Sequence, residues 1–316
     1  MASTVITTNT TTSTSLTGGD QYFLARGVTN ATVGSAIGYT GSGTGAIQIT
    51  VLGDLYSAIS APILLTGASA VLGGLIITVG IDGSIIGGSN STAIVTTIDN
   101  TVITNAGLIE GQLNLSSSAT PVVFNSGTIV QTVGTASAIT SFTDGLSLTN
   151  AGLVRSNGPA VQVIGNDASI DNSGSILAGN GLAIQVGSNA EIFSNGLISS
   201  LGSIAVRVGD DSTLTNHGDI AGEIEGGNVV SINNTGNISS DDRTVEVGQD
   251  AVIFNSGTIL GGWDGIAIGA SQRAVIDNTG VLQAGTGIEV STGQIRNSGT
   301  ITANFVGMTI GSNDQD

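Results

Sequence analysis

Acidic and amide side chains recur one turn before a repeated glycine motif and could offer oxygen ligands to a metal ion. Asp167, Asn189 and Asp211 each stand seven residues before a motif glycine, and Asp250 holds the same place further on. If successive repeats stack about 4.8 Å apart, these oxygens form a file that suits a hard cation such as calcium. We favour the simpler interpretation that acidic turn residues keep this corner solvated, and keep calcium binding as the alternative. The candidate ligands are Asp167, Asn189, Asp210, Asp211, Asp241, Asp242 and Asp250.

The motif that fixes this spacing is Asn-x-Gly-x-Ile, which returns about every 21 residues. Examples are Asn105-Ala106-Gly107-Leu108-Ile109 and Asn172-Ser173-Gly174-Ser175-Ile176. A fixed period of this length predicts a solenoid whose coils stack on their neighbours. Asn tolerates a left-handed backbone and can bond to its equivalents in adjacent coils, while Gly suits a positive φ. The expected turn ladder is Asn105, Asn125, Asn150, Asn172, Asn216, Asn234, Asn255, Asn278 and Asn297, with Ser194 in place of Asn in one coil.

Aliphatic residues occupy fixed places around each motif glycine, four residues before it and two residues after it. A third short segment alternates apolar and polar residues, as in Val206-Arg207-Val208 and Val245-Glu246-Val247. Alternation with period two is typical of a strand with one buried face. We therefore predict an all-β fold: a single right-handed parallel β-helix with three strands per coil of about 21 residues.

The regularity of the repeat changes along the chain. Residues 1–18 form a Thr/Ser-rich leader without a core-forming pattern, residues 19–95 are expected to form degenerate coils, and residues 96–316 regular ones. The uncharged stretch 57–81 resembles a membrane span in hydropathy, but its glycines, Pro62 and β-branched residues favour buried strands over a transmembrane helix.

The composition narrows the range of partners. The formal charge is −17, the six cationic residues are all arginines, and cysteine is absent. Such a chain repels nucleic acid and anionic membrane surfaces, so we expect neither as a partner, and it attracts divalent cations.

Residues for catalysis are sparse, and we expect no enzymatic activity. The one histidine, His217, lies inside a turn motif, and a phosphate-binding loop would need a lysine. Arg207, Arg243 and Arg273 are dispersed, so we expect no face that gathers several arginines with acids at neighbouring coils. A carboxylate pair for glycoside hydrolysis stays open as an alternative.

Coils of the form Ile-x-Asn-x-Gly-x-Ile, such as Ile253-Phe254-Asn255-Ser256-Gly257-Thr258-Ile259, resemble the β-helix regions of bacterial secreted and surface proteins. Autotransporter passengers, haemagglutinin-like adhesins and type I-secreted matrix proteins carry such coils. The resemblance covers about residues 77–316 and implies a structural or adhesive role outside the cell or on its surface. A cell-surface glycan is then a candidate partner, and a calcium-dependent binding module or a carbohydrate-active β-helix enzyme is the alternative function.

The two ends of the sequence indicate self-association. The segment Met308-Thr309-Ile310-Gly311 matches the strand that precedes each corner, and no further motif turn follows it. The leader contains Val5 and Ile6 in a segment with strand propensity. An open coil exposes unpaired backbone groups that invite another chain. We therefore expect head-to-tail filaments, in which Val5, Ile6, Met308 and Ile310 make the contact.

Overall fold

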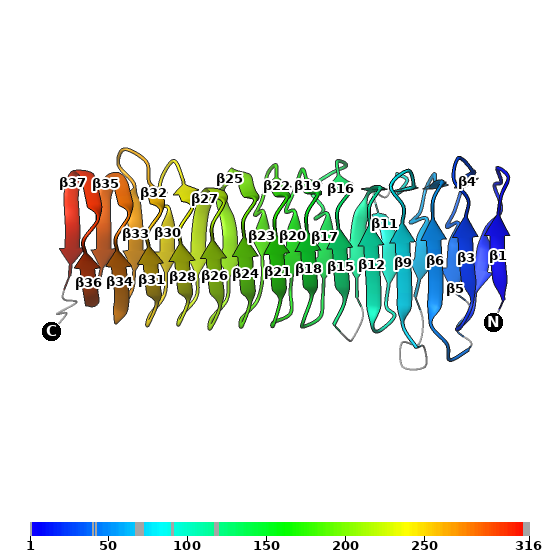
Figure 1. The fold of residues 1–316 in the computed structure, drawn as a ribbon, viewed down its shortest axis with the longest axis horizontal. Helices are drawn as coiled ribbons and strands as arrows, with labels where there is room; N and C mark the ends of the chain where they lie inside the picture. Colours follow the sequence, from blue (N-terminus) through cyan, green and yellow to red (C-terminus); the bar gives the residue numbers. More distant parts are fainter. Residues whose placement is uncertain are drawn as a thin grey trace. The chain divides into compact units, whose positions relative to one another are not determined.

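The computed structural model describes residues 2–39, 41, 43–66, 73–89, 92–116 and 120–311. The described chain is all-β, with parallel strands stacked as a β-solenoid of about 13 turns spaced by about 22 residues. This confirms the predicted fold class. Figure 1 draws the strands of successive coils as arrows coloured along the sequence. The chain divides into two compact units, unit 1 at residues 1–165 and unit 2 at residues 166–316.

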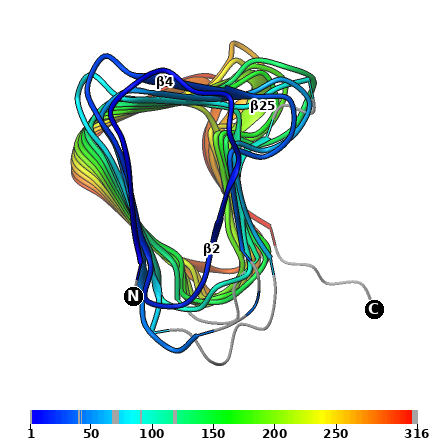
Figure 2. The same cartoon turned by 90° about the vertical axis from the view of Figure 1, so that its right-hand side faces the viewer.

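Each coil of unit 1 contributes strands to three faces, which we number in chain order. Figure 2 looks along the coils and shows β2 and β4, from the first and second coils, on different sides of the stack. Strands on one face pair in parallel with the strands of the coils before and after. Face 1 holds β1 (Ser3–Ile6), β3 (Gln21–Leu24), β6 (Ile47–Val51), β9 (Leu75–Val79), β12 (Thr101–Asn105), β15 (Val122–Asn125) and β18 (Ser147–Asn150). Face 2 holds β4 (Thr29–Thr32), β7 (Asp54–Ser57), β10 (Ser84–Ile86), β13 (Leu108–Glu110), β16 (Thr128–Gln131) and β19 (Leu153–Ser156). Face 3 holds β2 (Thr14–Leu16), β5 (Ile37–Tyr39), β8 (Ile63–Leu65), β11 (Thr92–Thr96), β14 (Gln112–Leu115), β17 (Ile139–Ser141) and β20 (Val161–Val163).

Unit 2 repeats this pattern, but in several coils the strands of faces 2 and 3 fuse. Strand β25 runs from face 2 to face 3 without a break, and its register with β27 shifts along the way. The fused strands are β25 (Leu197–Val208), β27 (Asp219–Gly226), β35 (Val281–Val290) and β37 (Thr300–Ile310). Face 1 holds β21 (Ser169–Asn172), β24 (Glu191–Ser194), β26 (Thr213–Asn216), β28 (Ser231–Asn234), β31 (Val252–Asn255), β34 (Ala274–Asn278) and β36 (Gly293–Asn297). The separate strands of faces 2 and 3 are β22 (Ser175–Ala178), β23 (Ile184–Gln185), β29 (Asn237–Ser239), β30 (Val245–Val247), β32 (Thr258–Leu260) and β33 (Ile266–Ala270).

The predicted aliphatic columns form the core. Ile103 and Val123 in unit 1, and Ile192 and Leu214 in unit 2, are buried and lie in register with their neighbours. Each fully buried aliphatic side chain stabilises the fold by about 1.5–3 kcal/mol, as an upper estimate. Because the backbone hydrogen bonds run between coils, stacking supplies both the apolar burial and the strand pairing.

The N-terminal segment differs from the expected leader. Strands β1 and β2 pair in parallel with β3 and β5, so this segment forms a coil of unit 1. Its alternation was hidden because Thr and Ser occupy places that carry aliphatic residues elsewhere. Further along, β11 spans the expected change near residue 95.

Strands also occupy the described parts of the apolar stretch 57–81, where β8 and β9 lie. Residues 67–72 of that stretch lie outside the described residues. In the described part of the chain, no helix has the length and apolar character needed to cross a membrane.

Candidate functional site

The motif asparagines line the inside of one turn in both units. All but Asn297 are buried, and in six of them the amide nitrogen donates to the side-chain oxygen of the equivalent asparagine one coil later. Six such bonds between asparagines measure 2.7–2.9 Å. The same nitrogen also reaches the carbonyl of the motif glycine two residues on, as Asn125 does with Gly127 at 3.3 Å. This ladder is the arrangement that the repeat indicates, and its role is structural; only Asn297, in the last described coil, is exposed.

The motif glycines have a different role from the one expected. They do not adopt positive φ; a Cβ at Gly127 would lie 2.2 Å from the carbonyl oxygen of Gly107 in the preceding coil. The same close approach recurs at Gly218 and Gly257, at 2.1 Å. The glycine is therefore required because adjacent coils approach closely, and not because its backbone is left-handed.

The left-handed residues lie instead in the acidic corner that precedes face 1. Asp167, Asn189, Asp211 and Asp250 have φ of 56–59°. Asp and Asn tolerate this conformation better than most residues. In each of these residues the backbone N–H donates to a carbonyl of the next coil, for example from Asp211 to Asn228 at 2.9 Å. Backbone geometry thus explains why these residue types recur at this corner.

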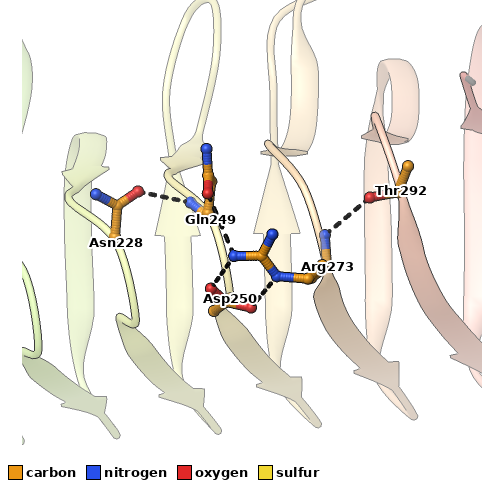
Figure 3. A network of polar contacts seen from close by, with 5 residues as sticks. All are labelled: Asn228, Gln249, Asp250, Arg273 and Thr292. Atoms are coloured by element: carbon orange, nitrogen blue, oxygen red, sulfur yellow. Dashed lines mark hydrogen bonds and ion pairs between the residues drawn. The ribbon is translucent and has the colours of Figure 1, made fainter. Parts of the chain in front are cut away.

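In the residues just before the left-handed ones, side-chain oxygens accept hydrogen bonds from backbone N–H groups of the next coil. Asp210 Oδ1 accepts the backbone N–H of Asn228 at 2.6 Å, and Asn228 Oδ1 accepts that of Gln249 at 2.9 Å. Figure 3 shows the continuation, in which Arg273 pairs with Asp250 through two nitrogens and donates its backbone N–H to Thr292. The hydrogen bond from Arg273 lowers the pKa of the Asp250 carboxyl.

The structure does not bring the seven candidate calcium ligands into one site. Asp241 and Asp242 lie on a different corner, at an open recess of about 480 Å³ together with Ser200 and Ser240. Among the described residues, no group of three His, Cys, Asp or Glu side chains is placed to hold a metal ion. The corner has a structural explanation, and calcium binding stays a prediction.

Face 3 of unit 2 carries a charged column that sequence reasoning missed. Arg207, Glu225 and Glu246 follow one another in register on adjacent coils. Arg207 pairs with Glu225, and Arg243 pairs with Glu246 at 2.6 Å. The expectation that no face gathers arginines with acids was therefore wrong. The missing signal was Ile224-Glu225-Gly226, where glycine replaces the aliphatic residue that marks this strand in other coils.

A carboxyl with an altered titration lies beside this column. Partial burial raises the pKa of Glu223 to about 7, and repulsion from Glu225, Glu246 and Asp242 adds to the shift, while Arg243 opposes it. A carboxyl whose pKa lies near neutrality beside other acidic side chains is a feature shared by acid–base sites and by structural ion-pair networks. We call Arg207, Glu223, Glu225, Arg243 and Glu246 the charged cluster.

Two members of the charged cluster, Arg243 and Glu246, also line a recess of about 250 Å³ in face 3. Arg243 and Glu246 lie on one side, Glu289 on the other, and Gly269 forms the floor between them. A Cβ at Gly269 would meet nothing nearer than the Val245 carbonyl oxygen at 3.7 Å, so packing does not require glycine there. The recess holds two carboxylates and an arginine within a few coils.

The residues expected to make the head-to-tail contact lie in the first and last described strands. Val5 and Ile6 belong to β1, and Met308 and Ile310 to β37. Phe124, Phe193 and Phe254 point outward from face 1, and Phe193 lies edge-on to His217 with ring centroids 5.2 Å apart. Trp263 packs in the same way against Phe305 at 5.1 Å.

Known proteins give no further identification of this chain. Comparisons with protein-family models, with curated proteins and with solved structures found no match. What is established is therefore the parallel β-solenoid itself, with its two units and its charged recess.

Proposed function

We propose that this protein is a non-enzymatic structural protein, outside the cell or on its surface, whose copies join head to tail into filaments or a matrix that supports adhesion. The observation that carries the proposal is an exposed continuation of the core. Met308 and Ile310 are 51% and 58% exposed, whereas their partners Ile288 and Val290 in the adjacent coil are 0% and 1% exposed. An added coil would bury these side chains and remove their apolar surface from water.

The backbone of the last described strand supports the same contact. β37 pairs with β35 along one edge, and no described strand pairs with its other edge. In the first described coil, β1 and β2 likewise pair on one side, with β3 and β5. A face-3 strand of one copy could extend the face-3 sheet of the next, so that Ile310 lies against the coil that holds β2. Such a contact does not close on itself and generates a filament.

The extracellular assignment follows from the sequence resemblance and the composition. A Gly-, Asn- and Thr-rich β-helix without cysteine resembles secreted adhesins and matrix proteins, and a charge of −17 keeps copies soluble until their ends meet.

Electron microscopy and sedimentation of purified chains test the assembly. Ile310→Asp should abolish polymers, because it places a charge where the next coil would cover it. Thr309→Asp is the matched control, since Thr309 lies in the same strand in register with the outward Glu289. Wild-type chains that remain monomeric at high concentration, or equal polymerisation by the two variants, would contradict the proposal.

A glycan site in the recess is the second candidate function. It is favoured by one specific observation, the convergence of Arg243, Glu246 and Glu289 around the Gly269 floor. Register places Glu246 and Glu289 two coils apart, about 9.6 Å between their backbones. Inverting glycosidases hold their two carboxyl groups about 6.5–9.5 Å apart, so binding and hydrolysis are both to be tested.

Glycan-array binding and reducing-end release test this second candidate. Gly269→Val fills the recess without a close backbone contact and should remove binding, whereas Thr213→Val on face 1 should leave it unchanged. Glu246→Gln separates hydrolysis from binding. If Gly269→Val binds glycans as wild type does, or wild type binds none, the recess has no such role.

A further inference from the structure

We infer that face 1 of unit 1 is a second self-association surface, on which another copy of the chain docks side by side. We call the outward surface of β1, β3, β6, β9, β12, β15 and β18 the neutral face. Two side chains of each strand point outward, and none of them is charged in any of the seven strands. Unit 1 holds six acidic residues, and none of them lies on this face.

Apolar side chains are contiguous at the centre of the neutral face. Ile76, Val102 and Val122 lie in register on three adjacent strands, and Phe124 follows two residues after Val122. Ile76 is 40% exposed and Phe124 45%. Thr78 and Thr104 continue the neighbouring column and add methyl groups. Contiguous exposed apolar surface on a soluble protein usually marks an interaction site.

Charge selects another copy of the same chain as the occupant. Two copies with a charge of −17 repel each other, and the repulsion falls where no carboxylate lies in the contact. The equivalent face of unit 2 carries Asp171, Glu191 and Asp277, so it would place acids against acids. A contact about a two-fold axis uses the same patch on both copies, so the neutral face of one chain would meet the neutral face of the other.

The size of the neutral face sets the expected strength. Seven strands about 4.8 Å apart and four residues of about 3.3 Å each give about 400 Å² per copy. A standard stable interface buries about 800 Å² per partner, so this contact should be weak and reversible. It is lateral, and its apolar centre lies on β9, β12 and β15, whereas the proposed head-to-tail contact uses β1, β2 and β37.

Sedimentation velocity on chains that carry Ile310→Asp isolates the lateral contact from any end-to-end contact. These chains should dimerise, and dimerisation should strengthen as NaCl rises, because salt screens the net repulsion and leaves the apolar contact intact. Val102→Asp should weaken the dimer at least tenfold. Thr213→Asp, at the matching outward position of unit 2, should leave it unchanged, and circular dichroism should show that both variants stay folded.

A single introduced cysteine gives a second readout, because the chain has none of its own. Thr104→Cys should form disulfide-linked dimers on oxidation, and Thr215→Cys in unit 2 should form far fewer. Chains that stay monomeric at every salt concentration, a dimer that weakens with salt, or equal cross-linking of the two variants would overturn the inference. Capture of a different molecule by a monomeric neutral face would also overturn it.

Discussion

Units 1 and 2 share one coil plan and differ in where their charge lies. Residues 1–165 hold six acidic residues and two arginines, for a net charge of −4, whereas residues 166–316 hold seventeen acidic residues and four arginines, for −13. Both units bury aliphatic columns and an asparagine ladder. Stacking therefore fixes the interior of both units alike, while the outer surface is free to diverge. The neutral face lies in unit 1, and the charged cluster lies in unit 2.

The interiors of the two units differ in the second coil of unit 1, which holds β3 and β4. Tyr22 and Asn30 are fully buried there, in register with Ile49 and Leu55 of the next coil. The amide nitrogen of Asn30 donates to the Tyr22 hydroxyl at 2.9 Å, and burial raises the pKa of that hydroxyl. Unit 2 has aliphatic residues at the equivalent places. The amide nitrogen of Asn30 is therefore paired at this core position, whereas its Oδ1 has no hydrogen-bond partner among the described residues.

The largest expected effect comes from charging an aliphatic column. Ile192→Asp in unit 2 should lower the free energy of unfolding by about 4 kcal/mol or more, because an unpaired carboxylate replaces a buried side chain. Glu191→Ser, one residue away and outward, is the control and should be nearly neutral. Chemical denaturation measures both, and a small loss for Ile192→Asp would show that the unit 2 core is not closely packed.

The polar core of unit 1 gives the next largest effect. Asn30→Leu should destabilise by about 1–3 kcal/mol, because the buried Tyr22 hydroxyl loses its partner. Adding Tyr22→Phe should recover most of this loss, since both polar groups are then gone. A double variant as unstable as the single one would show that the lost hydrogen bond between Asn30 and Tyr22 is not the cause of the destabilisation.

Val229 occupies a left-handed corner position in unit 2, and relieving the strain of this β-branched residue should stabilise the fold. Val229 has a φ of 58° at the place where Asp or Asn stands in four other coils. A β-branched residue in this region is disfavoured, so Val229→Asn should raise the free energy of unfolding by about 1 kcal/mol. Thermal melting compares it with Val252→Asn, an outward position in a strand, which should show no gain.

The asparagine ladder of unit 2 has one interruption. Asn172 reaches Ser194 Oγ at 3.3 Å, longer than the bonds between asparagines, and Asn216 Oδ1 has no hydrogen-bond partner among the described residues. Ser194→Asn should supply the donor and add about 1 kcal/mol. Hydrogen exchange at β24 and β26 should slow. A loss of stability would mean that this turn has no room for the amide.

The smallest effect concerns pH and the charged cluster. The pKa of Glu223 is about 7 when folded against 4.5 as a model value, so the folded state binds more protons between these values. Stability from this group therefore falls as pH rises from about 4.5 to about 7. Glu223→Gln should stabilise by on the order of 1 kcal/mol at pH 8, a value reduced for solvent screening, and should have little effect at pH 4.5. Melts at both pH values check the sign, and an equal effect at both would show that ionisation is not the cause.

The sequence by itself determined the period, the strands and the aliphatic columns, because a repeat that must stack on itself places the same residue type at each interior position. It also indicated the asparagine ladder, since Asn105 and its equivalents keep a fixed distance from the motif glycine. It could not separate the two reasons for a turn residue, close approach at Gly127 and left-handed backbone at Asp211, because both appear as conserved spacing.

Only the tertiary structure decided which outward residues meet. Arg207, Glu225 and Glu246 are 18 to 39 residues apart along the chain and become neighbours because coil lengths vary and a strand irregularity restores the register. The neutral face was hidden for the same reason, since Ile76, Val102 and Val122 adjoin one another only after the coils have stacked. Interior positions repeat because every coil must fit its neighbour. Outward positions carry no such constraint, and the register between coils decides which of their side chains become neighbours.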